Sequence, residues 1–555
     1  MTDVPRRWDR EADVVVAGSG AAGLCAALAA AAGGARVLVL EKASVLGGTT
    51  AMSGAGTWIP ANHHMLAAGM SDSTDEALTY IRGVAPDGWA EIEAPLWRAF
   101  VENAPAMLAF VEANSPLRFE LVHHPDPYVE APGGKAHGRM LSPRLISQNI
   151  LGPWRDRIRR FTRGQRFKYS EMVVGPVLSR PVPTLLKIAP ALAYRWLTRR
   201  VGMGNALVTG LLKGCLDHGV EIMAETRVTR LVTDGGGGTP SRVAGVEATG
   251  TGGLVAIRAA RGVVLATGGF EWDPELRARY FPGDVGLIGS PRTNTGDGQR
   301  MAAAAGARLE RMDQALIYCC LPIGYEGHRH AVPITDVYSP HCIVVDRTGC
   351  RFLNEGRPNL GVAIDERDPA TGLPVHLPAW RIFDAQFARK NPAVMLLWRL
   401  DRGRKLHTAP SLAHLAAQIG LGAPALTATV DRFNEFARRG RDDEFHRGET
   451  AWEKFNTPGG ALGTIERPPF YAAPFDRAIL VTKGGPRTNP SGQVLRDDGS
   501  VIEGLYCAGA AMANPIGSKA VGAGSTIGPC MTWGYICGRH LCAAHAREAA
   551  APSTA

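Results

Sequence analysis

Short apolar runs separated by small and polar residues organise the N-terminal part of the chain. Val14–Ala17 is a continuous apolar run, which is typical of a strand buried on both faces. An alanine-rich stretch that ends at Ala32 predicts a helix, and Arg36–Leu40 predicts a second strand. The order strand, helix, strand predicts the start of a parallel sheet of the α/β class.

Similar patterns continue along the chain. Apolar spacing predicts helices over 75–115, 204–218, 300–306 and 425–440, strands over 220–223, 261–266 and 504–510, and a hairpin of 225–231 and 242–247 around Gly235–Gly238. Between 272 and 473 proline and aromatic residues become more frequent, which favours an inserted domain. We therefore expect a nucleotide-binding domain formed by 1–271 and 474–555, with a cap or substrate domain at 272–473.

The composition is that of an ordinary soluble globular protein. The chain has 555 residues, of which 45% are hydrophobic and 20% charged. Its net charge of +9 is concentrated between Arg144 and Lys168, where eight basic residues accompany one acid, Asp156. The remainder is near neutral and lacks a nucleic-acid-binding module, so we expect no nucleic-acid partner. A solvated basic face is the preferred interpretation, ahead of a surface for anionic lipid or for an acidic partner.

Cysteine usage and hydropathy bear on the compartment. The ten cysteines show no recurring C-x-x-C spacing, and no apolar leader or run of about 20 apolar residues is present, so we expect a reduced, cytoplasmic protein. The apolar and basic stretch 185–200 fits a helix on the inner face of the membrane or a buried helix with a basic end, and the buried helix is preferred. His123 and His124 have no third ligand nearby, so we expect a surface loop there and no metal site.

Three glycines follow the first predicted strand with the spacing G-x-G-x-x-G: Gly18, Gly20 and Gly23. The first allows a tight turn, the second lets backbone approach a pyrophosphate, and the third lets the helix pack closely on the strand. The helix N-terminus adds N–H donors and the positive end of its dipole. Glu41 ends the second predicted strand, where an acid would bond ribose hydroxyls. This pattern predicts a dinucleotide site in preference to a structural glycine turn.

The following segment, Lys42–Gly56, is rich in glycine, serine and threonine and suits backbone that lies against a flat or phosphorylated ligand. With the preceding acid it resembles the flavoprotein family that joins soluble fumarate reductases, succinate dehydrogenase flavoprotein subunits and 3-ketosteroid dehydrogenases. The resemblance implies an α/β fold, with a Rossmann-like FAD-binding domain of the glutathione-reductase type and an inserted α+β cap. It also implies non-covalent FAD, because Thr49 and Thr50 stand where covalent members place a histidine.

The motifs and the resemblance together define the expected FAD-binding residues. The turn Ala266–Gly269 and the segment 504–526 match further FAD-contacting parts of the family, and a helix N-terminus after Gly524 would stabilise negative charge on the flavin pyrimidine. The expected residues are Gly18, Gly20, Ala21, Ala22, Gly23, Glu41, Lys42, Gly48, Thr49, Thr50, Ser53, Gly54, Val228, Ala266, Thr267, Gly268, Gly509, Ala510, Gly524, Ser525, Thr526 and Ile527.

The catalytic residues are expected from the same resemblance. In ketosteroid dehydrogenases a T-Y-P-G-A-G segment holds the 3-keto oxygen; the corresponding segment 519–524 keeps Gly524 but has Ala520 in place of the tyrosine. Their proton-accepting tyrosine follows an R-[FY]-x-N-E motif, and Asn359 fills that place after 351–355. Tyr128 lies in a proline-rich segment similar to one that lines their substrate pocket. The candidates are therefore Gly524, Tyr128, Tyr318, Tyr338, Arg357 and Asn359.

The expected reaction is the dehydrogenation of a C–C bond next to a carbonyl, with hydride transfer to flavin N5 and proton transfer to a side chain. Apolar residues around 516–521 favour a bulky ketone such as a 3-ketosteroid over a dicarboxylate. The alternatives are an enone or fumarate-type reductase and an inactive flavoprotein that binds a lipid-like ligand. No second nucleotide fingerprint is visible, so an external electron acceptor is expected.

Overall fold

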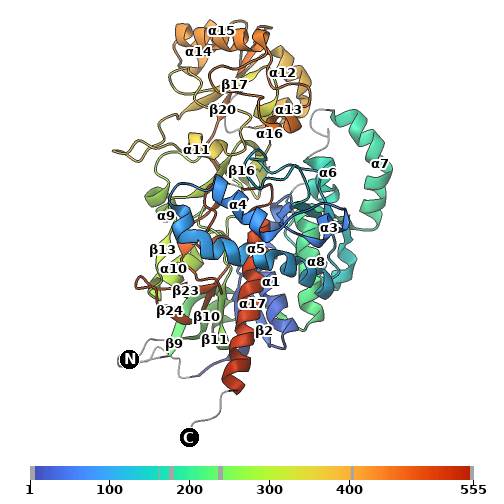
Figure 1. Ribbon diagram of the computed structural model, residues 1–555, viewed down its shortest axis with the longest axis vertical. Helices are drawn as coiled ribbons and strands as arrows, with labels where there is room; N and C mark the ends of the chain where they lie inside the picture. Colours follow the sequence, from blue (N-terminus) through green and yellow to red (C-terminus); the bar gives the residue numbers. More distant parts are fainter. Residues whose placement is uncertain are drawn as a thin grey trace.

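The computed structural model describes residues 7–161, 163–173, 180–234, 242–334, 336–401, 406–519 and 521–550. In the view of Figure 1 a lower part holds both ends of the chain, and an upper part holds the segment coloured yellow to orange. The predicted turn Gly235–Gly238 and Ala520 lie outside the described residues. None of the helices described is long and apolar enough to cross a membrane.

An eight-stranded sheet forms the centre of the lower part. Five strands run parallel in the order β24-β11-β1-β2-β8, and β10, β9 and β23 add antiparallel neighbours. The strands are β1 (Arg10–Ala17), β2 (Val37–Leu40), β8 (Glu221–Met223), β9 (Arg227–Asp234), β10 (Arg242–Gly250), β11 (Gly253–Leu265), β23 (Gln493–Leu495) and β24 (Val501–Cys507). The predicted α/β class is confirmed. Strand β11 begins earlier than predicted because its first half pairs with β10.

Helices pack against this sheet or against one another beside it. They are α1 (Ala21–Ala32), α8 (Met203–Asp217), α10 (Asp297–Ala304) and α17 (Ile527–Ala550). Glycines allow α17 to lie directly on α1: a Cβ on Gly534 would lie 2.2 Å from the Ala22 carbonyl oxygen, and one on Gly538 would lie 2.4 Å from that of Ala26. The first and last helices of the chain are thereby joined beside the glycine-rich turn that follows β1.

Smaller elements surround this core. The predicted helical segment 75–115 forms two helices, α4 and α5, which are interrupted at Ala85–Gly88. The elements are α2 (Gly48–Met52), α3 (His63–Ala67), α4 (Thr74–Val84), α5 (Trp89–Asn114), α6 (Tyr169–Met172), α7 (Pro181–Leu197), β3 (Thr57–Trp58), β4 (Phe119–Leu121), β5 (Met140–Pro143), β6 (Ile146–Ser147) and β7 (Arg200–Val201), with 3-10 helices η1 (Gln148–Arg157) and η2 (Arg163–Arg166).

The upper part contains two further sheets. One has the order β14-β21-β12-β16-β15 and the other β17-β18-β20-β19. Their strands are β12 (Leu287–Ile288), β14 (Ala315–Tyr318), β15 (Cys320–Tyr325), β16 (His328–Pro333), β17 (Cys342–Val345), β18 (Ala379–Phe383), β19 (His407–Ala409), β20 (Phe470–Phe475) and β21 (Ala478–Thr482). The boundaries 271/272 and 473/474 stay predictions; β21, which lies beyond the second, pairs with β12 and β14.

Helices flank these sheets, and short elements connect the two parts. The predicted amphipathic helix 425–440 is confirmed as α15 (Ala423–Arg439). The others are α9 (Pro274–Tyr280), α11 (Leu360–Ile364), α12 (Ala385–Lys390), α13 (Pro392–Leu400), α14 (Leu412–Ile419) and α16 (Ala451–Asn456), with β13 (Leu309–Glu310), β22 (Gly485–Pro486), η3 (Asp336–Tyr338) and η4 (Gly509–Ala511).

Two preferred sequence interpretations are wrong. The stretch 185–200 is helical, but it is not buried: of the residues in α7 only Arg195 is, and Leu186 and Leu197 are 71% and 72% exposed. His124 is not a surface residue, because its ring packs edge-on against Trp452 and Phe455. His123 is exposed, as expected.

Candidate functional site

A cavity lies at the carboxyl ends of the parallel strands β1, β2 and β11, where ligands bind in open α/β sheets. It brings together segments that are far apart in sequence, and most of the expected FAD-binding residues line it: Gly18, Gly20, Ala21, Ala22, Glu41, Lys42, Gly48, Thr49, Thr50, Ser53, Gly54, Val228, Ala266, Thr267, Gly268, Gly509, Ala510, Thr526 and Ile527. Gly23, Gly524 and Ser525 are not among the lining residues. Gly23 follows the lining residue Ala22 near the start of α1, and Gly524 and Ser525 precede the lining residue Thr526 just before α17.

The glycines form a cradle of backbone: a side chain on Gly18 or Gly23 would collide with neighbouring backbone, whereas Gly48 borders open space. Gly18 has φ +108°, and a Cβ on it would lie 2.3 Å from the Ala266 carbonyl oxygen. A Cβ on Gly23 would lie 2.0 Å from the Gly18 carbonyl oxygen, inside the turn. On Gly48, by contrast, a Cβ would meet no atom within 4 Å. This backbone fits a dinucleotide, since its exposed amides and open faces can accept a pyrophosphate.

Charged residues at the end of β2 hold the turn in place. The Glu41 carboxylate accepts hydrogen bonds from the Ser19 hydroxyl (2.6 Å) and the Ala43 amide (2.9 Å). The Lys42 ammonium is 2.9 Å from Asp297, which also pairs with Arg227 at 2.8 Å. Both expected residues face the cavity, but each is already bonded to protein groups, so ribose or phosphate contacts would add to these bonds.

The segment after α2 is pressed against the start of α17. The Trp58 amide donates to the Gly524 carbonyl oxygen at 3.2 Å, and a Cβ on Gly522 would lie 2.1 Å from the Trp58 ring. The helix N-terminus at Thr526 and Ile527 therefore faces the cavity opposite the segment 48–54, as the sequence predicts.

Two pairs of candidate catalytic residues meet on one loop. Asn359 donates through its side-chain nitrogen to the Tyr128 hydroxyl at 2.5 Å. The hydroxyls of Tyr318 and Tyr338 are 2.9 Å apart, and Tyr338 also donates to the Arg357 carbonyl oxygen at 3.3 Å. Loop 354–359 thus contacts Tyr128 and Tyr338 directly, and Tyr318 is joined to it through Tyr338.

The environments of these phenols differ. Burial raises the pKa of Tyr128, while the hydrogen bond from Asn359 and the charge of Arg357 lower it. Burial also raises the pKa of Tyr318 and of Tyr338; the charge and the hydrogen bond of Tyr338 add to the rise for Tyr318, and hydrogen bonds with Tyr318 and Trp452 partly oppose it for Tyr338. Tyr128, Tyr318 and Tyr338 are not among the residues that line the cavity, although Leu316, on the same strand as Tyr318, is. Of the three phenols, Tyr128 is the one whose pKa a hydrogen bond from Asn359 and the charge of Arg357 oppose, and burial still keeps that pKa above its ordinary value.

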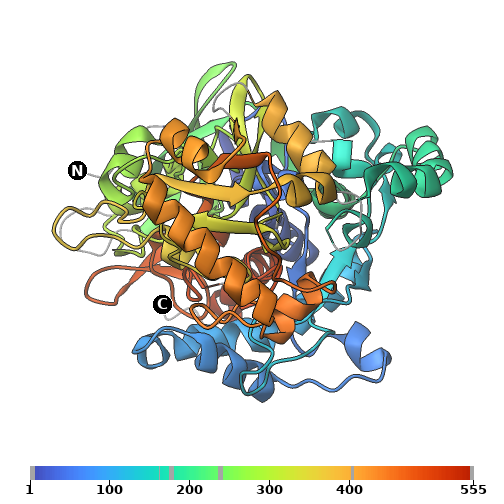
Figure 2. The same ribbon diagram turned by 90° about the horizontal axis from the view of Figure 1, so that it is seen from above.

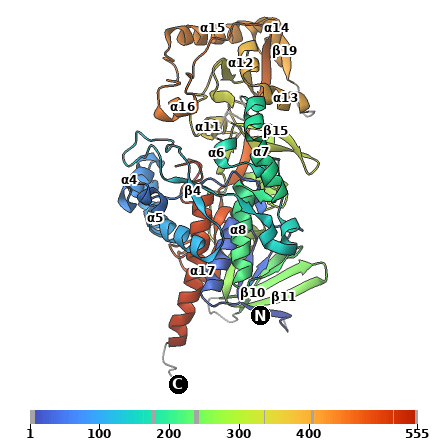
Figure 3. The same cartoon turned by 90° about the vertical axis from the view of Figure 1, so that its right-hand side faces the viewer.

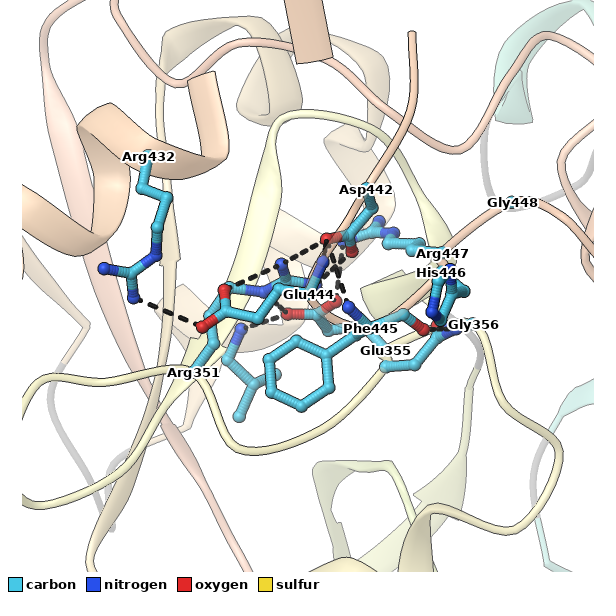
Figure 4. A network of polar contacts seen from close by, with 12 residues as sticks. Arg351, Glu355, Gly356, Arg432, Asp442, Glu444, Phe445, His446, Arg447 and Gly448 are labelled. Atoms are coloured by element: carbon cyan, nitrogen blue, oxygen red, sulfur yellow. Dashed lines mark hydrogen bonds and ion pairs between the residues drawn. The ribbon is translucent and has the colours of Figure 1, made fainter. Parts of the chain in front are cut away.

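A buried ion-pair network holds this loop (Figure 4). Arg351 is 2.9 Å from both Glu355 and Asp442, and Arg447 is 3.1 Å from Glu355. All four side chains are fully buried. The network ties the motif segment 351–355 to Asp442 and Arg447, and it fixes the backbone that carries Arg357 and Asn359.

Several residues around the cavity were missed by the sequence reasoning. Asn294 and Asp297 line it near the turn Ala266–Gly268, and Lys483 lies 3.5 Å from the Thr526 hydroxyl. Burial lowers the pKa of Lys483 to about 8. The Gly296-Asp-Gly298 turn resembles the turn at 266–269 and is a signal for this region, but nothing local in the sequence shows which side chains turn inward.

A second cluster, distant in sequence from the cavity lining, was also missed. His63 and His64 on α3 lie 2.8 and 3.0 Å from the Glu112 carboxylate on α5. Of the described residues, these three form the one group with the spacing of a metal site. Glu112 also accepts from the Phe119 amide, so the cluster is satisfied as a hydrogen-bonded joint between α3, α5 and β4.

The parallel sheet, the glycine cradle and the dipole at α17 define a dinucleotide-binding oxidoreductase fold. Residues 13–527 match the family described as FAD binding domain. The chain belongs to this family of FAD-binding flavoproteins.

Three proteins named as ketone dehydrogenases are similar to this chain over nearly its full length. A 3-oxosteroid 1-dehydrogenase of Mycobacterium tuberculosis is 36% identical, covering 96% of this chain and 98% of the relative. A 4-oxocyclohexanecarboxylate 2-dehydrogenase of Sinomonas cyclohexanicum is 37% identical, with coverage of 95% and 92%. The solved 3-ketosteroid delta1-dehydrogenase from Sterolibacterium denitrificans, in complex with 1,4-androstadiene-3,17-dione, is 33% identical with a TM-score of 0.87, covering 96% and 100%. The predicted family and its ketosteroid dehydrogenase branch are confirmed.

Proposed function

We propose that the chain is an FAD-dependent dehydrogenase that introduces a double bond next to a ring ketone, with 3-ketosteroids as its substrates. The observation that carries this proposal is the Tyr128 phenol, which accepts from Asn359 on the loop that also binds Tyr338. The dehydrogenases similar in sequence support the same reaction class.

Gly524, Tyr128 and Asn359 would each have a separate role in the dehydrogenation. When bound, FAD supplies a hydride acceptor. The Gly524 amide would polarise the keto oxygen, which makes the neighbouring C–H acidic. Tyr128 would take that proton, and the Asn359 amide, which cannot act as a base, would stabilise the phenolate by donating to it. The substituted tyrosine position at Asn359 thus becomes a supporting donor.

A smaller substrate is the second candidate. The relative named 4-oxocyclohexanecarboxylate 2-dehydrogenase acts on a cyclic ketone that carries a carboxylate. Arg357 is exposed and acts electrostatically on Tyr128, so a cation is near the proposed base. The apolar lining residues Leu316, Leu480 and Val481 favour the steroid.

Anaerobic titration of the holoprotein separates these candidates. We expect bleaching of the visible flavin absorption by a 3-ketosteroid such as 4-androstene-3,17-dione. Bleaching by 4-oxocyclohexanecarboxylate alone would support the second candidate. A shifted but unbleached spectrum with the steroid would identify a binding protein, and no change with either ketone would refute the proposal.

The expected FAD-binding residues, including Gly23 and Ser525 beside the cavity, are proposed to hold FAD without a covalent bond, because Thr49 offers no nucleophilic ring nitrogen. Acid precipitation should leave all the flavin in the supernatant. We propose an external electron acceptor, and a cytoplasmic location, which the unpaired state of all ten cysteines supports.

A further inference from the structure

Helix α7 projects from the body of the protein. Figures 1 and 2 show it standing away from the lower part in two perpendicular views. Its apolar side chains face solvent: Val182, Leu186, Trp196 and Leu197 are 65–72% exposed. A solvated helix would normally turn polar side chains outward, so this apolar surface points to a partner.

The charges around α7 have one sign. Between Arg180 and Arg200 the chain has five basic residues and no acid. At the C-terminal end of the helix, a hollow is lined by Arg155, Arg160, Arg166 and Arg199 together with Trp196 and Leu197. The acid there, Asp156, pairs with Arg155 at 3.1 Å and Arg160 at 3.0 Å. The four arginines outnumber this one acid, so positive charge prevails in the hollow, and burial together with the neighbouring Arg160 and Arg199 lowers the pKa of Arg166.

We propose that α7 and the arginine hollow, together called the α7 surface, dock on a bilayer that contains anionic phospholipid. The exposed apolar residues of α7 would enter the acyl region, Trp196 would lie at the interface, and the arginines would bind lipid phosphates. Arginine forks match phosphate geometry, and apolar helices flanked by cations bind anionic membranes. A protein partner would need only the apolar face of α7, whereas an anionic bilayer would bind both the apolar face and the arginine hollow.

The α7 surface is linked through α6 to Gly54, one of the residues that line the cavity. Arg195 fixes α7 to α6 through Glu171 at 2.6 Å. On α6, the Tyr169 ring lies 3.0 Å from the position that a Cβ on Gly54 would take. If the proposed function holds, docking would bring the cavity close to a membrane-dissolved ketone; docking itself does not depend on that function.

Vesicle flotation of the holoprotein tests the proposal directly. The probes are vesicles of phosphatidylcholine with phosphatidylglycerol and vesicles of phosphatidylcholine alone. The wild type should float with the anionic vesicles and lose binding at high salt. Leu186→Glu with Leu197→Glu should weaken binding at least tenfold, and Arg160→Gln with Arg199→Gln about thirtyfold. Matched controls on other faces are Leu254→Glu, at a site 65% exposed, and the pair Arg438→Gln with Arg439→Gln.

The outcomes are distinct. Selective loss in the α7 variants, with unchanged circular dichroism and flavin content, supports docking even if no ketone bleaches the flavin. Failure of the wild type to float at low salt overturns it, as does equal binding by the α7 and control variants. A dimer that sediments as a monomer after Leu186→Glu, with no vesicle binding, would assign the surface to a second copy and also overturn it.

Discussion

A single hydrogen atom at Gly23 decides whether the first turn of α1 can lie against β1. A methyl group there would lie 2.0 Å from the Gly18 carbonyl oxygen, so either the turn or the helix must move. We expect Gly23→Ala to destabilise the protein by about 2–4 kcal/mol, as overpacking against rigid backbone does, and to lose most bound FAD. Chemical denaturation and the flavin-to-protein absorbance ratio measure both effects.

Gly83→Ala is the matched control for this substitution. Gly83 lies in α4, and a Cβ there would meet nothing within 4 Å. The change should be neutral or stabilise by about 0.5–1 kcal/mol, because alanine favours the helix. If Gly23→Ala were as mild as Gly83→Ala, the turn would be far more yielding than its contacts indicate.

The proposed base can be tested at Tyr128 and Asn359. Tyr128→Phe should reduce kcat/KM about 10²–10⁴-fold. Asn359→Leu removes the hydrogen bond that lowers the pKa of Tyr128, so that pKa should rise and the increase of kcat/KM with pH should shift to higher pH. The pH profiles of both variants measure this, and Tyr338→Phe is the control. An unshifted profile in Asn359→Leu would separate Tyr128 from proton transfer.

The sequence predicts the role of a residue when its partners lie in the same short segment, and fails to do so when they lie far away in the chain. The roles of Gly18 and Gly23 follow from a strand and a helix within the same short segment, so their spacing is sufficient. The contact of Tyr128 with Asn359 joins positions 231 residues apart, and burial of His124 depends on Trp452 and Phe455. No periodicity within one segment contains such information.

At the scale of the elements, buried ion pairs hold loop 354–359 in its position. Glu355 accepts from both Arg351 and Arg447 in a fully buried setting (Figure 4). Glu355→Gln should destabilise the protein by about 3–5 kcal/mol, because it leaves buried guanidinium charge uncompensated. Glu435→Gln, which breaks an exposed pair with Arg439, should cost less than about 1 kcal/mol. Thermal denaturation compares the two, and equal losses would contradict this account.

The same network predicts a direction for acid sensitivity. Its arginines lower the pKa of Glu355 and of Asp442 below the ordinary values of 4.5 and 3.8. A carboxyl group with a lowered folded-state pKa contributes stability above its unfolded pKa and loses it as the pH falls through the lowered value. Stability should therefore decline below about pH 4.5, and less steeply in Glu355→Gln. A parallel decline in both proteins would locate the acid sensitivity elsewhere.

Helices α1 and α7 show where element prediction succeeds and fails. Both are apolar, but α1 is followed by a strand and preceded by a glycine turn, which places it on a sheet. For α7 the same apolar content fits burial or exposure equally, and the surrounding segments do not decide between them. Tertiary context decides instead: most residues of α8, which is predicted from similar periodicity, are buried, whereas Arg195 is the one buried residue of α7. Figure 3 shows both helices from the side on which α7 projects in Figure 1.

At the scale of the whole molecule, the cavity is closed by segments from both ends of the chain. Gly522 packs on Trp58, α17 packs on α1, and β24 pairs with β11, and a cofactor in the cavity would add further contacts between these parts. Removing FAD should therefore lower the melting temperature strongly. At a cofactor concentration of about 1,000 Kd the loss is roughly 4 kcal/mol of stability. The buried cluster around β17, α14 and α15 contains no cavity residue, so it should be affected least. Hydrogen exchange with and without FAD measures this gradient, and uniform deprotection of both parts would show that the cofactor stabilises the molecule as a single cooperative unit.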